Sequence, residues 1–194
     1  DASSEPLSEF WIAEMSKSAT TTKSITLGYE KYKTESTLTN ILIRFEHLLN
    51  AIQCFSFAKS GAPFMAFGAN LAYQKKDFFK VNGFIKHIKL KFGETNLFIR
   101  DAATAKNINY TISKKSFIEI DAPKSFYEWF QKQRIKRTIQ GFYKRKHRYL
   151  LSFFTFSKIV FYSLGIYLFF VYPWQIILPI FLFFVLIQYL VICF

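Results

Sequence analysis

The sequence predicts an α/β domain over residues 1–124, followed by a basic amphipathic segment and two transmembrane helices. Patterns typical of helices and of strands alternate over residues 1–124, as they do in α/β domains. All 13 acidic residues lie within residues 1–128, where 17 Lys and Arg leave a net charge of only about +4. The other nine basic residues lie between Lys132 and Lys158, and the chain ends in two apolar runs.

The first predicted elements are a strand and a long helix. Residues 24–29 have the composition of a strand, and Gly28 indicates a turn or bulge. Apolar residues then recur at three- and four-residue steps, which predicts an amphipathic helix from about Thr37 to Ala58, ended by residues 60–63, Ser-Gly-Ala-Pro. We expect its apolar stripe to lie in the core. The stripe comprises Leu38, Ile41, Leu42, Phe45, Leu48, Leu49, Ile52 and Phe55.

Shorter elements complete the predicted domain. Two buried strands are expected on either side of Gly68, and a helical turn is expected before Gly83. A second helix is predicted to follow Thr95. The predicted strands are 64–67, 70–73, 108–112 and 117–120, and the predicted helical turn is 77–80.

Residues 125–149 interleave aromatic residues with Lys and Arg. A basic amphipathic segment rich in Trp and Tyr suits a membrane interface, where its cations meet phosphate groups. Aromatic residues among cations also stack on nucleic-acid bases, which is the alternative. Because the segment directly precedes the apolar runs, we expect a membrane partner and no nucleic acid.

Residues 150–171 and 174–194 are each long enough for one bilayer crossing, and Tyr172-Pro173 forms a tight joint between them. Lys158, the one charge in the first run, either extends toward the basic side or indicates that this crossing begins lower and tilts. The excess of cations before the first run predicts that residues 132–148 are cytoplasmic. We therefore expect a multi-pass membrane protein, in a bacterial cell one of the inner (plasma) membrane, with residues 1–124 in the cytoplasm.

Four short segments carry a resemblance to a known family. In chain order they are Asp1-Ala2-Ser3, residues 68–73 (Gly-Ala-Asn-Leu-Ala-Tyr), residues 93–97 (Gly-Glu-Thr-Asn-Leu) and residues 131–134 (Gln-Lys-Gln-Arg). Together with the apolar tail, they resemble the second half of a membrane-bound family 2 glycosyltransferase. The resemblance implies the C-terminal part of a GT-A (Rossmann-like) catalytic domain. It also implies a fragment whose nucleotide-binding half precedes Asp1, and which is inactive alone.

The resemblance implies a metal ligand at Asp1. The Asp-x-Asp segment of the family binds a divalent metal, Mg²⁺ or Mn²⁺, on the sugar diphosphate, because a hard cation prefers oxygen ligands and neutralises the departing diphosphate. Ser3 stands where the second Asp is expected. A hydroxyl is a weaker ligand than a carboxylate.

The resemblance also implies substrate-binding roles for Gly68 and Asn70. Glycine permits close approach of the backbone to a ligand, and an asparagine amide offers a donor and an acceptor to sugar hydroxyls. The alternative is a buried turn in which Asn70 caps its own backbone.

Glu94 matches the acidic residue that takes the proton from the acceptor hydroxyl in the family, and the resemblance therefore implies that it is the general base. The alternative is a helix start at which the helix dipole favours Glu in the first turn.

Residues 131–134 resemble the family's Gln-x-x-Arg-Trp segment, which implies that Gln131 and Arg134 bind the diphosphate. Arg can hold it through two parallel hydrogen bonds. A second frame, Gln133 with Lys136, lacks the Arg, and two exposed polar residues on a basic helix remain the structural alternative.

The predicted function is inverting, metal-assisted transfer of a sugar from a nucleoside-diphosphate sugar to a hydroxyl of a glycan or lipid-linked acceptor, in the synthesis of cell-surface or extracellular polysaccharide. The alternative is a catalytically inactive relative that binds a glycan or a partner subunit at the membrane; the residues Ser3 and Glu94 motivate it. A polybasic membrane anchor with an unrelated small domain is a third hypothesis, against which the order of the motifs argues.

Overall fold

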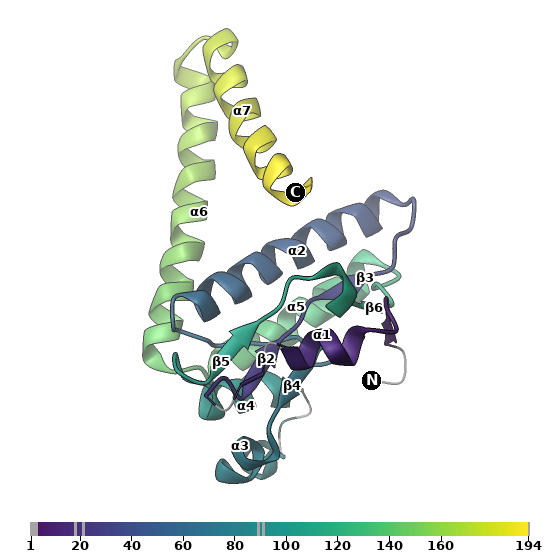
Figure 1. Ribbon diagram of the computed structural model, residues 1–194. Helices are drawn as coiled ribbons and strands as arrows, with labels where there is room; N and C mark the ends of the chain where they lie inside the picture. The colour runs from purple at the N-terminus through teal and green to yellow at the C-terminus, as the bar shows by residue number, and fades with distance from the viewer. Residues whose placement is uncertain (1–3, 18, 21, 89, 91, 194) are drawn as a thin grey trace. The chain divides into compact units, whose positions relative to one another are not determined.

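The protein is described here by a computed structural model, which covers residues 4–17, 19–20, 22–88, 90 and 92–193. The chain forms two compact units, residues 1–144 and residues 145–194. The first unit is mixed α/β and the second is a pair of helices (Figure 1). The first unit thus combines helices and strands, as the alternating pattern of the sequence indicates, and the GT-A architecture stays a prediction.

One small sheet of the first unit has β2 (Ile25–Leu27) at its centre. Strand β4 (Leu71–Tyr73) pairs with β2 antiparallel and β5 (Ile108–Tyr110) pairs with it parallel. All three residues of β2 are buried, the polar Thr26 together with Ile25 and Leu27. The core of the unit is built around this strand and α4 (Glu94–Ala102), whose buried residues Leu97, Phe98 and Ile99 are at most 1% exposed.

A second sheet has the order β1-β6-β3. Strand β6 (Ile118–Ile120) pairs antiparallel with β1 (Glu5–Pro6) and parallel with β3 (Glu30–Tyr32). Between β2 and β3 the chain passes from one sheet to the other through Gly28 and Tyr29, so the predicted strand 24–29 ends earlier than expected and a new strand begins at Glu30.

Gly28 is required by a close approach at this crossing. Its N–H donates a 2.8 Å hydrogen bond to the carbonyl of Asn70. A Cβ at position 28 would overlap the amide group of the Asn70 side chain. The turn that the sequence indicated at Gly28 thus has a steric cause.

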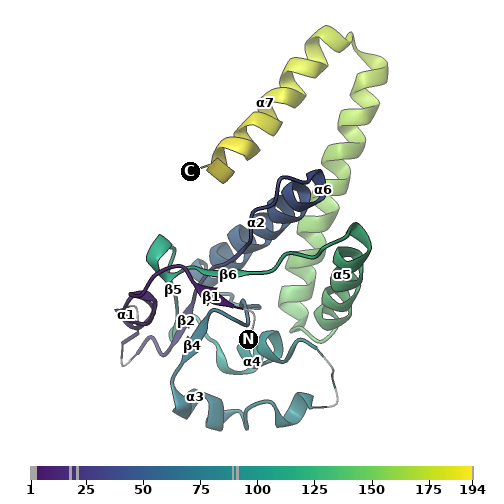
Figure 2. The same cartoon turned by 90° about the vertical axis from the view of Figure 1, so that its right-hand side faces the viewer.

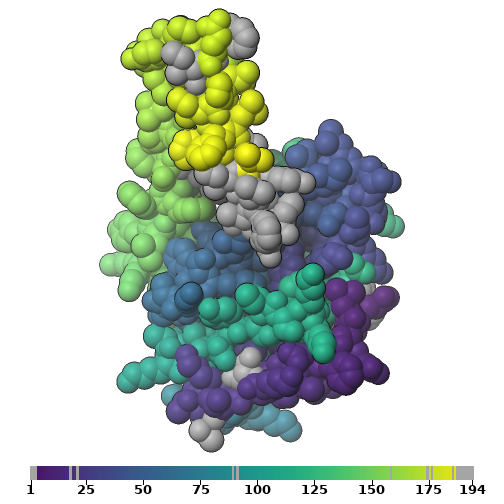
Figure 3. Space-filling view, turned by 45° about the horizontal axis from the view of Figure 1, so that its top comes forward, coloured from purple at the N-terminus to yellow at the C-terminus, as the bar shows by residue number. Residues whose placement is uncertain are grey.

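The long predicted helix is α2 (Leu38–Lys59). The Thr37 hydroxyl caps it by accepting a 3.2 Å hydrogen bond from the N–H of Asn40, and Gly61 leaves the helix with a φ of +76°. The end of α2 lies against the segment that contains β5, where the rings of Phe55 and Tyr110 are 5.8 Å apart; the space-filling view shows this neighbourhood in blue and teal (Figure 3).

The prediction that the whole apolar stripe of α2 lies in the core is wrong for its first half. Leu38 is 72% exposed, and Ile41 and Leu42 are each 53% exposed. The buried residues also recur at three- and four-residue steps, but they lie on the opposite face of α2, which likewise carries apolar residues. The buried residues are Asn40, Ile43, His47, Ala51, Cys54 and Ala58.

Residues 64–67 are buried as predicted, but they form an irregular segment and no strand. The remaining short elements are α1 (Trp11–Lys17), α3 (Lys75–Lys80), η1 (Ile85–His87) and η2 (Lys114–Ser116). Gly83, which the sequence predicted to close α3, has a φ of +55°. Figure 2 shows α3 and α4 on the same side of the strands.

The basic segment 125–149 is divided in the structure. Its first part forms α5 (Phe126–Gln140), which belongs to the first unit; Ser125 caps it by accepting a 3.1 Å hydrogen bond from the N–H of Glu128. Its last residues begin α6 (Arg145–Val171) in the second unit. The predicted boundaries after residues 124 and 149 therefore differ from the single division found here, because α5 packs on α2 instead of standing apart.

In the second unit, α6 and α7 (Trp174–Cys193) pack together, with the rings of Phe161 and Phe184 5.6 Å apart. Pro179 lies inside α7. Among the described residues, one helix, α6, is long and apolar enough to cross a bilayer. The second predicted crossing stays a prediction.

Candidate functional site

A polar cleft of about 450 Å³ opens in the first unit. Five separate segments contribute to it: the start of β3, the loop before β4, the start of α4, the end of β6, and α5. The lining residues are Glu30, Gly68, Ala69, Glu94, Thr95, Ile120, Asp121 and Lys132. Two predicted site residues, Gly68 and Glu94, thus lie in one cleft.

Glu94 occupies the first position of α4, at the edge of the cleft. Gly93 precedes it with a φ of +88°, and an added Cβ there would overlap Ile139 of α5. The chain therefore enters α4 directly beneath α5, and the exposed carboxylate of Glu94 stands at the positive end of the helix dipole. Glu94 therefore lies in the first turn of a helix, as the alternative interpretation predicted, and it is also accessible to a ligand.

Gly68 allows its loop to approach the start of α4. A Cβ at position 68 would lie 3.2 Å from Oγ1 of Thr95, which is tighter than ordinary van der Waals contact. Close packing of the loop on Thr95 keeps the cleft narrow at this end.

Two carboxylates of the cleft were not identified from the sequence. One is Asp121, whose Oδ1 lies 3.1 Å from Nζ of Lys33, and the other is Glu30. It lines the cleft although it is only 8% exposed. The N–H of Ala69 donates a 2.5 Å hydrogen bond to its Oε1. Burial raises the pKa of the Glu30 carboxyl, and the backbone N–H groups of Ala69 and Asn70 oppose that rise. A glutamate within an otherwise strand-like stretch was the available signal.

His47 of α2 contacts the backbone of Glu30. Its Nε2 is 2.8 Å from the backbone carbonyl of Glu30, and its ring packs 4.3 Å from Tyr32 and 5.1 Å from Phe67, measured between ring centroids. Burial lowers the pKa of His47 to about 4. The imidazole is therefore neutral at physiological pH and donates its Nε2–H to the carbonyl, which fixes the start of β3.

Asn70 does not offer its side chain to the cleft. The side chain is fully buried, and its Nδ2 donates to the carbonyls of Tyr29 and Ser116, each at 2.8 Å. Its Oδ1 accepts a 3.0 Å hydrogen bond from the indole of Trp11. The expected contact between Asn70 and sugar hydroxyls is therefore not what this geometry provides: Asn70 joins four segments of the chain and holds the Gly68 loop.

The segment 131–134 reaches the cleft through Lys132. The side chain of Gln131 donates to the Tyr127 hydroxyl at 2.8 Å, and Arg134 is exposed; neither lines the cleft. Gln131 and Arg134 face away from the cleft because of their positions around the axis of α5: Lys132 lies about 100° from Gln131 and about 200° from Arg134.

The second frame, Gln133 with Lys136, has a structural role. Gln133 Nε2 donates a 3.0 Å hydrogen bond to Glu46 of α2, and Lys136 Nζ lies 4.0 Å from the same carboxylate. These contacts hold α5 against α2.

Asp1 and Ser3, the predicted metal-binding segment, lie outside the described residues. Within the described part of the chain, no group of three or more His, Cys, Asp or Glu is close enough to hold a metal ion. The divalent metal and its ligand Asp1 stay a prediction.

No protein-family model matches the sequence, and no curated protein matches it. The chemistry of the cleft is therefore the basis for a functional proposal.

Proposed function

We propose that the protein transfers a sugar from a nucleoside-diphosphate sugar to a hydroxyl of a glycan or lipid-linked acceptor. One observation carries the proposal. Three segments that resemble glycosyltransferase motifs, and that are far apart in the sequence, contribute Gly68, Glu94 and Lys132 to a single polar cleft. The GT-A architecture and membership of family 2 belong to the same proposal.

Glu94 is the proposed general base. It is exposed at the cleft, so it can reach an acceptor hydroxyl at hydrogen-bond distance, take its proton and leave the oxygen free to attack the sugar. Lys132, whose Nζ lies 3.5 Å from Glu128, supplies positive charge to the same cleft, where it can stabilise the negative charge of a diphosphate leaving group. Glu30 holds the backbone of the loop at Ala69. Arg134 and Gln131 take part only if α5 turns about its axis in the complex with substrate.

The second candidate is an inactive relative that binds a glycan or a partner subunit at the membrane. It is favoured by the same features that weaken catalysis: Ser3 in place of a second Asp, and the absence of Asn70, Gln131 and Arg134 from the lining of the cleft.

We propose further that α6 and α7 both cross the membrane, with the basic flank of α6 and the cleft in the cytoplasm. The helical hairpin and the lack of any acid after Glu128 support this topology.

Sugar transfer by membranes that contain the full-length protein tests the proposal, with a panel of radiolabelled nucleoside-diphosphate sugars as donors. We expect Glu94→Gln to reduce the rate roughly 10²- to 10⁴-fold, because it removes the proton acceptor and keeps the shape. Glu94→Asp should retain activity, and Glu9→Gln, an exposed acid in no cleft described here, is the matched control. Transfer unchanged by Glu94→Gln would show that the base lies elsewhere. Binding of a nucleotide sugar without transfer by the wild-type protein would favour the inactive relative.

A further inference from the structure

The first half of α2 presents an apolar face that the first unit leaves uncovered. Leu38, Ile41, Leu42 and Phe45 are 36–72% exposed, although the opposite face of the same helix is buried in the core. A helix that is apolar on all sides is usually found inside a large core or in contact with lipid. The exposed side therefore indicates a second apolar environment.

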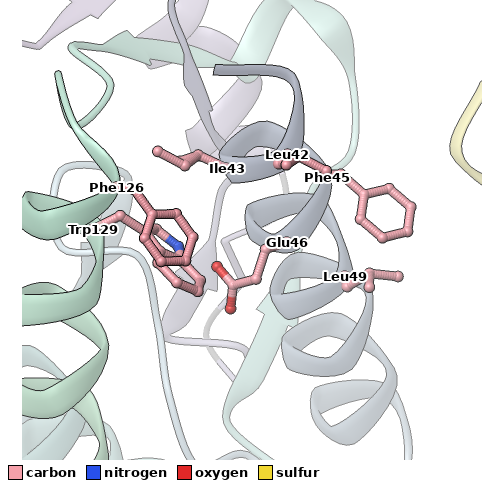
Figure 4. Close-up of a pocket in the computed structure, with 7 residues that line it drawn as sticks. All are labelled: Leu42, Ile43, Phe45, Glu46, Leu49, Phe126 and Trp129. Atoms are coloured by element: carbon pink, nitrogen blue, oxygen red, sulfur yellow. The ribbon is translucent and has the colours of Figure 1, made fainter. Parts of the chain in front are cut away.

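A groove of about 260 Å³ runs between this face and α5. It is lined by Leu42, Phe45 and Leu49 from α2 and by Phe126 and Trp129 from α5, as Figure 4 shows. The groove is apolar apart from Glu46, whose carboxylate is held by Gln133 and by the amide of Asn50. It suits a hydrocarbon chain better than a sugar.

The indole ring of Trp129 forms part of the wall of the groove. Trp side chains are enriched at the interface between membrane and water, where the ring lies at the level of the headgroups. A Trp in the wall of an apolar groove therefore suits a surface that meets lipid.

The outer face of α5 carries aromatic residues and then cations. Phe126 is 60% exposed and Phe130 50% exposed, and Arg134 and Arg137 follow on the same face at helical spacing. Both arginines are exposed and make no ion pair with any described residue. Only four residues separate α5 from α6, the helix that is able to cross a bilayer.

We propose that this α2–α5 face, made of Leu38, Ile41, Leu42, Phe45, Phe126 and Phe130, is a membrane-binding surface that takes acyl chains of an anionic leaflet. An acyl chain occupies the groove, and lipid phosphates meet Arg134 and Arg137. Helix α2 thereby brings the first unit itself onto the bilayer, whether or not the protein transfers a sugar.

Site-directed spin labelling of the whole chain in lipid vesicles tests this surface. In a background with Cys54→Ala and Cys193→Ser, a nitroxide is placed through Leu38→Cys or Leu42→Cys. Ile12→Cys on α1 is the matched control, because Ile12 is 71% exposed and Leu38 72% exposed, and Ile12 is outside the α2–α5 face. Collision rates with oxygen, which concentrates in hydrocarbon, and with a water-soluble nickel chelate measure the depth of each label.

In vesicles of phosphatidylcholine with phosphatidylglycerol, we expect labels at 38 and 42 to collide preferentially with oxygen and the label at 12 to collide preferentially with nickel. In phosphatidylcholine alone, or after Arg134→Gln with Arg137→Gln, the oxygen preference at position 42 should fall at least severalfold. Nickel access at 42 equal to that at 12 would overturn the proposal. Protection of 42 from both reagents would also overturn it, because protein would then cover the face. An oxygen preference that is identical in both lipid compositions would refute the assignment to an anionic lipid.

Discussion

Acidification is expected to destabilise the first unit through one buried histidine. His47 stays neutral because its ring is packed among Tyr32, Phe67 and Tyr29, and no carboxylate oxygen of the described residues is hydrogen-bonded to it. Desolvation lowers its pKa to about 4, whereas a histidine in the unfolded chain titrates near 6.5. Below about pH 6.5 the imidazole of the unfolded chain becomes protonated, whereas that of the folded unit stays neutral. The contribution of His47 to the free energy of unfolding is therefore fully present above that pH and is lost toward pH 4.

The two pKa values determine the size of the loss. At pH 7.5 both states hold a neutral imidazole, and the linkage free energy is close to zero. At pH 5 the unfolded state is almost fully protonated and the folded state hardly at all, which corresponds to a loss of about 2 kcal/mol in the free energy of unfolding. A loss of this size is a large fraction of the stability of a small domain.

Urea unfolding of the protein in detergent, followed by near-ultraviolet circular dichroism at pH 7.5 and pH 5, measures this loss. His47→Gln keeps a donor for the Glu30 carbonyl but does not titrate, so we expect its stability to fall by about 2 kcal/mol less than that of the wild type over this range. His87→Gln, which replaces the histidine that lies 2.9 Å from Asp101, controls for the loss of any histidine. Equal pH dependence of the wild type and His47→Gln would refute the argument.

Two further changes follow from the structure. Glu30→Gln should raise the free energy of unfolding at pH 7.5 and have little effect at pH 4, because ionisation of the buried Glu30 penalises the folded state only as the pH rises past the unfolded pKa; an equal gain at both pH values in the same urea assay would contradict it. For the topology, a cysteine placed at Arg145 at the start of α6 should resist a membrane-impermeant maleimide added outside intact cells and react after the membrane is permeabilised. External labelling there would overturn the cytoplasmic orientation.

The elements that the sequence predicted well are those with strong local signals. The cap at Thr37 and the positive φ of Gly61 place both ends of α2 within a residue of the prediction. Apolar composition alone was a poorer guide, because residues 64–67 are buried without sheet partners. Their burial comes from long-range packing, which a local pattern does not reveal.

In the site, too, residues with a local signal were predicted, and residues whose position depends on long-range contacts were not. Gly68 and Glu94 reach the cleft because each lies at a local feature, a close approach and a helix start, that the residue types indicate. Glu30 was missed because its position depends on the crossing between two sheets. Gln131 and Arg134 were predicted to line the cleft but do not, because of the orientation of α5 about its axis. That orientation is set by the contacts of Gln133 and Lys136 with Glu46.

The pairing of the strands has a consequence for synthesis of the chain on the ribosome. Glu5 in β1 pairs with Glu119 in β6, and Ile25 in β2 pairs with Ile108 in β5. The sheet of β2 is therefore complete only when about residue 110 has left the exit tunnel, and the sheet of β6 only when about residue 120 has left it. The hydrogen bond from the Asn70 side chain to the carbonyl of Ser116 likewise forms only after residue 116 has been synthesised. Contacts this distant in sequence close slowly, and the nascent chain must keep its apolar N-terminal segments unassociated in the meantime. Helix α6, which is long and apolar enough to cross a bilayer, begins 25 residues after the end of β6. The membrane insertion of α6 that we propose would therefore fall in the same short interval of translation as closure of the sheets.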